Sequence, residues 1–452
     1  MDIERRHLFA LTAGLGLAGA ASQSDAAAKR TAPEEMVVFI SPSAEADATG
    51  RLQSAFDRAA RLAKPVRLAA GHYPVRGDLR LPAALKLDGQ DGLATIDLIG
   101  QGAIIADGAG AITVRGLTVD GTASQRPSEH DALMALTACR DLSLSDLYLR
   151  MAPANALKLW QCSGTVSHCR FEHIAHTAIN SGNADGLSIT ANRIDHAGNN
   201  GIVVWRDTQG ADATAITLNR ISHIRSDAGG SGQNGNAINA FRSGHVLISS
   251  NIIAHCAYSA VRCNAASNAQ IIANNCRHLG EVALYAEFGF EGAIIANNIV
   301  DHAATGIEVT NFDHGGRLAT VQGNVIRNLV RREHEPVDKR GIGIGVEADT
   351  VVNGNTIENA ATSGIAIGWG RFMRHVAVQG NLVRDAEAGI TISVHGRDAP
   401  AAGILIASNI VTGSRSGAIR LSDHGTLVDP PLANGDGDDK SAAALVYGNL
   451  LS

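Results

Sequence analysis

Aromatic residues are scarce in this chain: Phe, Trp and Tyr make up 4% of its 452 residues, whereas glycine occurs 49 times. This composition is unusual for a helix bundle and typical of stacked strands with tight turns. Only 18% of the residues are charged, and a net charge of −6 gives no electrostatic reason to expect nucleic-acid binding. Beyond the N-terminus no apolar run reaches the ~20 residues of a membrane-spanning helix. We therefore expect a β-protein with neither a nucleic-acid partner nor a membrane anchor after leader removal.

The first 28 residues have the features of an export signal. Arg5 and Arg6 precede an apolar run over residues 8–21, and small residues follow at positions 26–28. The arginine pair and the residues after it, RRHLF, resemble a twin-arginine signal, and a general secretory signal that contains two arginines is the alternative. The resemblance implies that the twin-arginine translocase is a partner and that the mature protein is periplasmic or secreted.

From residue 140 onward one phrase recurs, with the pattern apolar-x-x-Asn-x-apolar, a polar turn, and Gly-apolar-x-apolar. The shortest distance between successive copies of this phrase, as from Asn251 to Asn274, is what we call the base step, and its length is typical of a repeat protein. Apolar and polar residues alternate within each copy, which indicates strands. We predict an all-β, right-handed parallel β-helix whose coils stack ~4.8 Å apart, with turn asparagines hydrogen-bonded along the axis. The predicted ladder positions are Asp146, Cys169, Asn192, Asn219, Asn251, Asn274, Asn297, Asn324, Asn355, Asn381, Asn409 and Asn449.

A short helix is expected before the repeat, and a strand over residues 66–68 and a turn over residues 71–73 follow it. An open solenoid end needs a cap. We therefore assign residues 29–110 to an N-terminal cap with the first coils, and residues 111–452 to the repeats. The apolar face of the capping helix is predicted to consist of Leu52, Ala55, Phe56, Ala59 and Leu62.

Three short motifs in this cap resemble the opening of pectate-lyase-type and polygalacturonase-type β-helix proteins. They are Asp47-Ala48-Thr49, Gln53-Ser54-Ala55 and Gly71-His72-Tyr73. The leader and the repeats together also resemble an uncharacterised family of twin-arginine-translocated β-helix repeat proteins. The resemblance implies a pectin-lyase-like solenoid for the whole chain. It brings no activity, because the sequence shows neither the paired aspartates and Gly-His-Gly set of polygalacturonases nor a clear pectate-lyase calcium cluster.

Two columns of outward side chains emerge when the strands after each ladder position are aligned. Between residues 158 and 310 these side chains are large or polar, and the later coils are nearly bare. Arg262, Tyr285 and Glu308 are predicted to be successive rungs of one column, with Glu287 in the neighbouring column. We predict that these four residues form a catalytic floor.

Two insertions, after Asn219 and after Asn324, leave the same turn and bracket three coils of minimal length. They predict two walls beside the catalytic floor. After the second insertion the inward residue is expected to be Ile342, which leaves Gly343 and Gly345 facing outward. The predicted substrate-binding residues on this face and its polar loops are Lys158, Trp160, Trp205, Asp207, Asn239, Phe241, Asn264, Asp313 and His314.

Two kinds of chemistry fit these side chains, with an acidic polysaccharide as the predicted partner. In β-elimination or epimerisation Arg262 would neutralise the uronate carboxylate, and Tyr285, His314 or Lys158 would exchange protons. In hydrolysis Glu287 and Glu308 would be acid and base. One rung and two residues separate their β-carbons by roughly 8 Å, and inverting glycosidases have ~6.5–9.5 Å between carboxyls. A glycan-binding or envelope scaffold protein without catalysis is the alternative, and Arg262, Glu287 and Glu308 would then be a surface ion-pair ladder.

A file of histidines suggests a third class, a periplasmic metal-handling protein, because imidazoles suit Zn, Cu and Ni. Asn or Asp takes the same position in later coils, from Asp301 onward, which favours a polar ladder without metal. Asp436, Asp438 and Asp439 could bind Ca²⁺, but the EF-hand spacing is absent, so no cofactor is predicted. The histidines of the file are His173, His196, His223, His255 and His278.

Cysteines are few, at six, and two of them occupy equivalent repeat positions. Cys139 and Cys162 are one coil apart, which places their Cα atoms about 4.8 Å from each other and within disulfide range. The periplasm would permit this bond. The other four cysteines fall at different repeat positions and are expected in the core.

Overall fold

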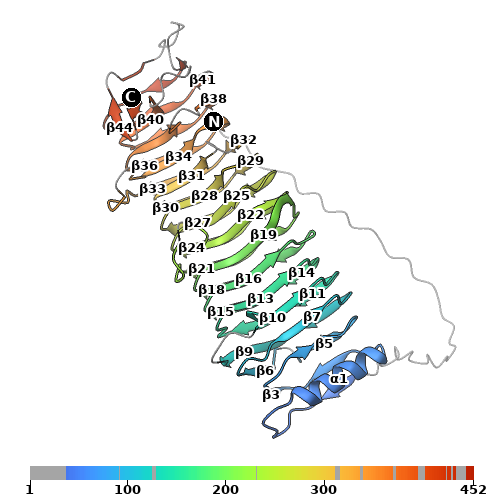
Figure 1. Cartoon of the computed structure of the whole chain (residues 1–452). Coiled ribbons are helices and arrows are strands. Elements are labelled where there is room, and N and C mark those ends of the chain that lie inside the picture. Colours follow the sequence, from blue (N-terminus) through green and yellow to red (C-terminus); the bar gives the residue numbers. More distant parts are fainter. Residues whose placement is uncertain are drawn as a thin grey trace, which may run out of the picture. The chain divides into compact units, whose positions relative to one another are not determined.

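The computed structural model describes residues 37–452, apart from residues 91, 125–128, 231, 311–315, 336–338, 370–372, 395–402, 424, 429–430 and 434–443. Within this part the chain forms a right-handed parallel β-helix of three sheets (Figure 1). Successive coils give successive strands to each sheet, in parallel register. The predicted all-β fold is confirmed. The predicted export signal lies outside the described residues.

The three sheets contain sixteen, fifteen and fifteen strands. The sixteen-stranded sheet runs from β1 (Val38–Ile40) to β45 (Leu445–Tyr447), and one fifteen-stranded sheet runs from β3 (Gly71–Val75) to β46 (Leu450–Leu451). We call the third the β4–β44 sheet. Its strands are β4 (Leu79–Arg80), β7 (Ile104–Asp107), β10 (Ala132–Thr137), β13 (Asn155–Trp160), β16 (Thr177–Gly182), β19 (Asn200–Ala211), β22 (Asn236–Gly244), β25 (Val261–Asn264), β28 (Val282–Glu287), β31 (Thr305–Thr310), β34 (Ile342–Val346), β37 (Ser363–Ile367), β40 (Ala388–Ser393), β43 (Ile419–Asp423) and β44 (Thr426–Val428).

Helix α1 (Thr49–Arg61) packs against β1, β2 (Val66–Leu68) and β4, at the start of the solenoid. Leu52, Phe56 and Ala59 are fully buried as predicted. The helix ends at Arg61, so Leu62 follows it and is 49% exposed, and its predicted place on the buried face is wrong. No helix in the described part of the chain is long and apolar enough to cross a membrane.

The motif residues of the cap tie α1 to the first coils. The Gln53 side chain exchanges hydrogen bonds with the backbone of Arg80, accepting from its N–H at 2.8 Å and donating to its carbonyl at 3.0 Å. The predicted turn over residues 71–73 is instead the start of strand β3. Tyr73 is fully buried there, and its hydroxyl donates to the carbonyls of Ile40 and Ala69 at 2.8 and 2.9 Å.

A ladder of buried asparagines runs along one turn of the coils. The amide oxygen of Asn219, for example, accepts hydrogen bonds from the backbone N–H and the side chain of Asn192 at 2.9 and 3.0 Å. The same exchange repeats in successive coils, so each buried amide is satisfied within the ladder. Its members are Asn192, Asn219, Asn251, Asn274, Asn298, Asn324, Asn355, Asn381, Asn409 and Asn449.

The predicted ladder was wrong at two positions. Asn298 occupies it and is fully buried, whereas Asn297 is exposed with a φ of 57°. The coil between Asn274 and Asn298 has one residue more than the base step. Because Asn297 and Asn298 are adjacent, the sequence alone does not show which of them belongs to the ladder. Leu147, not Asp146, is the buried residue one coil before Cys169. Its carbonyl accepts a hydrogen bond from the N–H of Arg170, the residue after Cys169.

Replacing Asn298 by alanine is expected to destabilise the chain by about 1–3 kcal/mol, because two buried donors of Asn274 lose their acceptor. Asn297→Asp is the matched control. It keeps a residue type that tolerates positive φ and is expected to change stability by less than about 0.5 kcal/mol. Urea denaturation followed by circular dichroism measures both. Equal effects would contradict the register of the ladder.

Candidate functional site

The β4–β44 sheet aligns the predicted catalytic residues in two outward columns. Arg262 on β25, Tyr285 on β28 and Glu308 on β31 are successive Cα partners in adjacent strands. Asn264 and Glu287 are partners in the neighbouring column. The predicted register of these three coils is confirmed.

The next coil has a different register from the predicted one. Ile307 pairs with Ile344, and Glu308 pairs with Gly345, so the alignment through Ile342 was wrong by two residues. Sequence reasoning therefore missed Glu347, which follows Gly345 on the outward face. The segment GIGIGVE alternates so regularly that either register fits it, and only its glutamate could have drawn attention.

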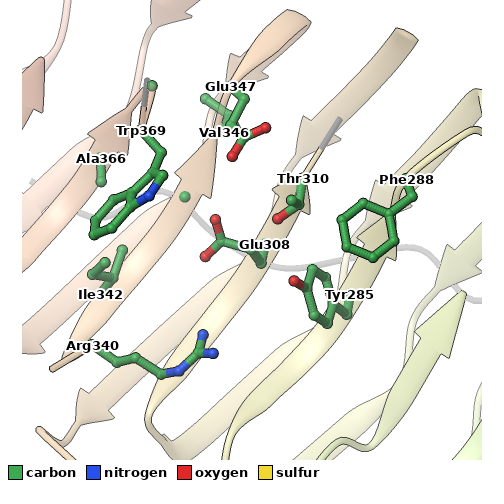
Figure 2. A pocket seen from close by; sticks show the side chains of 12 residues that line it. Tyr285, Phe288, Glu308, Thr310, Arg340, Ile342, Val346, Glu347, Ala366 and Trp369 are labelled. Atoms are coloured by element: carbon green, nitrogen blue, oxygen red, sulfur yellow. The ribbon is translucent and has the colours of Figure 1, made fainter. Parts of the chain in front are cut away.

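A cavity of about 250 Å³ lies over β28, β31 and β34, and we call it the carboxylate cavity (Figure 2). Figure 2 shows the carboxylates of Glu308 and Glu347 directed into the same space, with Tyr285 on one side and the indole of Trp369 on the other. The side chains that carry its chemistry are Tyr285, Phe288, Glu308, Arg340, Glu347 and Trp369. The sequence alignment had suggested that the later coils carry almost no large or polar outward side chains. This prediction was wrong, because Glu347 and Trp369 of these coils line the cavity.

Glu308 lies directly over Gly345 of the next strand. A Cβ at position 345 would come within 2.5 Å of Glu308 Oε2, so the missing side chain makes room for the carboxylate. Glu347 is only 5% exposed. It lies one rung and two residues from Glu308, which separates their β-carbons by roughly 8 Å. This separation of the β-carbons leaves space for a water and a glycosidic bond between the two side chains.

Tyr285 lies beside these carboxylates with an altered acidity. Burial raises the pKa of its phenol well above the ordinary value, and the negative charges of Glu287 and Glu308 raise the pKa further. The side chain of Thr310 hydrogen-bonds to the phenol. Tyr285 therefore stays protonated at neutral pH and serves as a hydrogen-bond donor rather than as a base.

Arg340 reaches the carboxylate cavity from the second insertion, residues 330–341. Its Nη2 lies 3.1 Å from Glu281 Oε1, and Arg332 Nη1 from the same insertion lies 3.4 Å from that oxygen. Glu281 thus holds the insertion against the floor, and Arg340 brings a positive charge to the cavity. The second predicted wall is confirmed in this position.

Arg262 and Glu287 form a buried ion pair beside this cavity. Glu287 Oε1 and Oε2 accept hydrogen bonds from Arg262 Nη2 and Nε at 2.7 Å each, and Asn264 Nδ2 donates to Oε2 at 2.9 Å. The two side chains are 11% and 4% exposed. Glu308 and Glu347 line the carboxylate cavity, whereas Glu287 is not among its described lining residues, so the pair of acid and base suits Glu308 and Glu347 better than Glu287 and Glu308. Catalytic roles for Arg262 and Glu287 stay predictions.

A second cavity of about 430 Å³ lies over β19, β22 and β25, and we call it the amide cavity. Arg262 lines it, whereas Tyr285 on the next rung lines the carboxylate cavity. The predicted floor thus serves two neighbouring cavities. The lining residues that bear on its chemistry are Asn180, Trp205, Gln233, Asn239, Phe241 and Asn264.

Gly232, Gln233 and Asn234 of the first insertion form the wall of the amide cavity, and buried amides hold this segment there. Asn200 Nδ2 and Asn239 Nδ2 donate to the Gln233 carbonyl at 3.0 and 3.1 Å. Gly232 has a φ of 143°, and a Cβ on it would overlap Arg262 Nη1, so only glycine allows this approach. The first predicted wall is confirmed.

The other predicted binding residues include three described ones that line neither cavity. Lys158, Trp160 and Asp207 are not among the described lining residues of either one. Trp160 packs on Trp205 with ring centroids 5.2 Å apart, and Asp207 accepts a hydrogen bond from Asn183 at 2.8 Å. The predicted polar loop with Asp313 and His314, and the three aspartates predicted for Ca²⁺, lie outside the described residues.

The predicted histidine file exists and is one member longer. His302, not Asp301, occupies the sixth position, because Asn298 sets the phase of that coil. Neighbouring rings lie 4.6–5.2 Å apart. All six residues have φ between 54° and 68°, and Asn328, Asn359 and Asp385 of the later coils have the same conformation. This turn selects His, Asn or Asp because they tolerate the left-handed region.

Two groups of side chains could hold a metal ion among the described residues. One is Asp195 with His196 and His223, and the other is Asp78 with Glu129 and His130. In the first group the two imidazoles are stacked, with 15° between their planes. Stacked rings direct their in-plane lone pairs side by side rather than toward one ion, so this file fits a structural ladder better than a metal centre.

The six cysteines of the chain are buried free thiols. The thiols of Cys139 and Cys162 donate to backbone carbonyls, those of Thr137 and Leu136 among them, and no disulfide joins these two cysteines in the structure. The other four are core residues, as expected.

Comparison with known proteins places the fold. No curated protein matches the sequence. The pre-mature gene product 12 of bacteriophage phi29 is similar in structure, with 12% identity and a TM-score of 0.55 over 86% of this chain, which spans 57% of that protein. An alginate lyase in complex with a trisaccharide is similar over 91% of this chain and 94% of its own, with 14% identity and a TM-score of 0.51.

These identities show a shared fold and no more. The model of the right-handed β-helix region matches residues 155–326 and 200–383, which together span just over half of the sequence. The chain therefore belongs to the family of proteins with a right-handed β-helix region.

Proposed function

We propose that the protein binds a polysaccharide along the outer face of the β4–β44 sheet and hydrolyses it in the carboxylate cavity. The observation that carries this proposal is the pair Glu308 and Glu347, which face one cavity between Tyr285 and Trp369. The trisaccharide bound to the alginate lyase of similar fold adds support for a polysaccharide as the ligand.

The reaction follows from two carboxyl groups on opposite sides of a glycosidic bond. One of them, protonated, gives its proton to the leaving oxygen as the bond between that oxygen and the anomeric carbon breaks. The other removes a proton from the water that attacks the anomeric carbon. A spacing of roughly 8 Å between β-carbons leaves room for this water, so we expect inversion at the anomeric carbon. Tyr285 donates a hydrogen bond, and Trp369 and Phe288 contact the sugar ring.

Elimination or epimerisation of a uronate is the second candidate, and Arg340 favours it. Its guanidinium reaches the same cavity and would neutralise a substrate carboxylate, which is what an acidic polysaccharide requires. Tyr285 is a poor base for this reaction, because its raised pKa keeps the phenol protonated. A carboxylate would have to remove the proton from the sugar carbon instead.

Location is a separate part of the proposal. The arginine pair before an apolar run supports export through the twin-arginine translocase, to the periplasm or beyond the cell. In that location the protein would meet envelope or environmental polysaccharides directly.

The test is turnover by the purified chain on pectate, alginate, hyaluronan, heteroxylans, glucans and mannans. New reducing ends and unsaturated-uronate absorbance are followed in parallel, and the anomer formed is read by NMR. We expect reducing ends without absorbance and an inverted product. Both signals together would replace hydrolysis by elimination. Retention of a glycan without either signal would leave a binding or scaffold protein.

A further inference from the structure

The amide cavity is distinct in chemistry from the carboxylate cavity. Its described lining contains one charged side chain, Arg262, and the buried carboxylate of Glu287 neutralises that charge through two hydrogen bonds of 2.7 Å. The other polar lining side chains are amides and the hydroxyl of Thr177. The cavity is therefore polar and electrically balanced.

Two aromatic rings on adjacent rungs give this cavity its apolar surface. Trp205 pairs with Phe241 in the register of β19 and β22. Trp205 Nε1 donates to Asn180 Oδ1 at 2.9 Å, which fixes the orientation of the indole. Phe241 is 36% exposed, so part of its ring faces the solvent-filled space of the cavity. Fixed aromatic faces contact the C–H face of a sugar ring.

The amides match the hydroxyl groups of a sugar. Each amide has donor and acceptor atoms, as each hydroxyl has. Asn239 and Asn264 project from the adjacent strands β22 and β25, and Asn180 projects from β16, on the other side of β19. Gln233 lines the cavity from the wall. A uronate carboxylate bound in the amide cavity would lose its hydration and would lie close to the Glu287 carboxylate. The charge of Arg262 would not compensate for this, because Arg262 is already bound to Glu287 by two hydrogen bonds. Like charges at short range and lost hydration both oppose its binding.

We propose that the amide cavity is a binding subsite for an uncharged sugar unit, so the substrate carries uncharged sugars next to the bond that reacts. This inference rests on the proposed function for its direction toward polysaccharides. Phe241 and Glu308 are three rungs apart, roughly 14 Å along the axis. One sugar ring cannot fill both cavities, so the ligand is a chain of linked sugars aligned with the solenoid axis.

The experiment measures binding by calorimetry with the full chain and its Trp205→Ala and Phe241→Ala variants. The probes are xylo-, gluco- and manno-oligosaccharides, N-acetylglucosamine oligomers, and oligogalacturonate and oligoalginate of equal length. We expect at least one uncharged series to bind, with each variant weakening it about tenfold or more. Phe39→Ala removes a ring of the same kind on β1 that is 59% exposed and far along the sequence from the cavity. This variant is expected to leave the affinity unchanged.

Three results would overturn the inference. They are binding of the uronate series alone, no binding of any uncharged series, or uncharged ligands that bind equally to parent and variants. Trp205→Phe, which keeps a ring, checks that any loss from Trp205→Ala is not unfolding, and thermal denaturation is recorded for every variant. Failure of the proposed function looks different. Uncharged sugars would bind and depend on Trp205, but no reducing ends would form.

Discussion

Glu308→Gln and Glu347→Gln are each expected to lower polysaccharide cleavage by about 10²–10⁴-fold, because each removes one of the two groups that move protons. Glutamine keeps the size of the side chain and one acceptor oxygen but cannot exchange the proton. Initial rates of reducing-end formation measure the loss. Binding of the oligosaccharide should persist in both variants, so the effect should appear in kcat rather than in KM.

The matched control is Glu358→Gln on β36 (Thr356–Ala360), in a different sheet, where Glu358 pairs with Arg384 near the surface. It is expected to keep full activity. A second comparison, Glu287→Gln, separates the two possible acid–base pairs. The chemistry would belong to Glu287 and Glu308, the pair predicted from sequence, if two results were found together. Glu287→Gln would lower the cleavage rate as much as Glu308→Gln does, and Glu347→Gln would not lower it.

Glu287→Leu is expected to destabilise the chain by about 3–5 kcal/mol, because the buried Arg262 guanidinium loses its carboxylate partner. The double variant Arg262→Met with Glu287→Leu should recover most of that loss, since apolar side chains of similar volume need no counter-charge. Denaturation midpoints measured by circular dichroism give both values.

An exposed ion pair supplies the control for this experiment. Glu291 is paired with Arg317 on the surface, with side-chain exposures of 60% and 49%. Glu291→Leu is expected to cost no more than about 1 kcal/mol. If Glu287→Leu were as mild, the network around Arg262 would be a surface feature with little energetic weight, and the division between the two cavities would lose its basis.

Much of the fold could be predicted from the sequence because the repeat constrains every coil in the same way. The register from Lys158 to Glu308 was correct, since the distance from each ladder position to the inward apolar residue of its strand identified the paired residues in these coils. The alignment failed where local sequence allowed two answers. Asn297 and Asn298 are identical neighbours, and the alternating glycines before Glu347 fit either register equally well.

The site was harder to predict than the fold because its chemistry depends on partners from distant segments. Arg262 and Glu287 had been predicted on neighbouring rungs, but only side-chain geometry shows that they bind each other. Trp369 and Arg340 reach the carboxylate cavity from loops, and loop residues follow no repeat position. Sequence alignment therefore placed the predicted floor on the face and coils that line both cavities, but it joined the two cavities into one.

The asparagine ladder bears on how such a protein can change over evolutionary time. Each coil begins again in phase at its own asparagine, so residues added to one coil do not displace the next. The two long insertions show this tolerance, since the strand after each one still pairs in parallel with the coil before it, Ile238 with Ile202 and Ile344 with Ile307. Walls can therefore be lengthened, shortened or transplanted while the floor stays fixed. New specificities can arise by exchange of segments equivalent to residues 225–235 and 330–341, with no redesign of the solenoid.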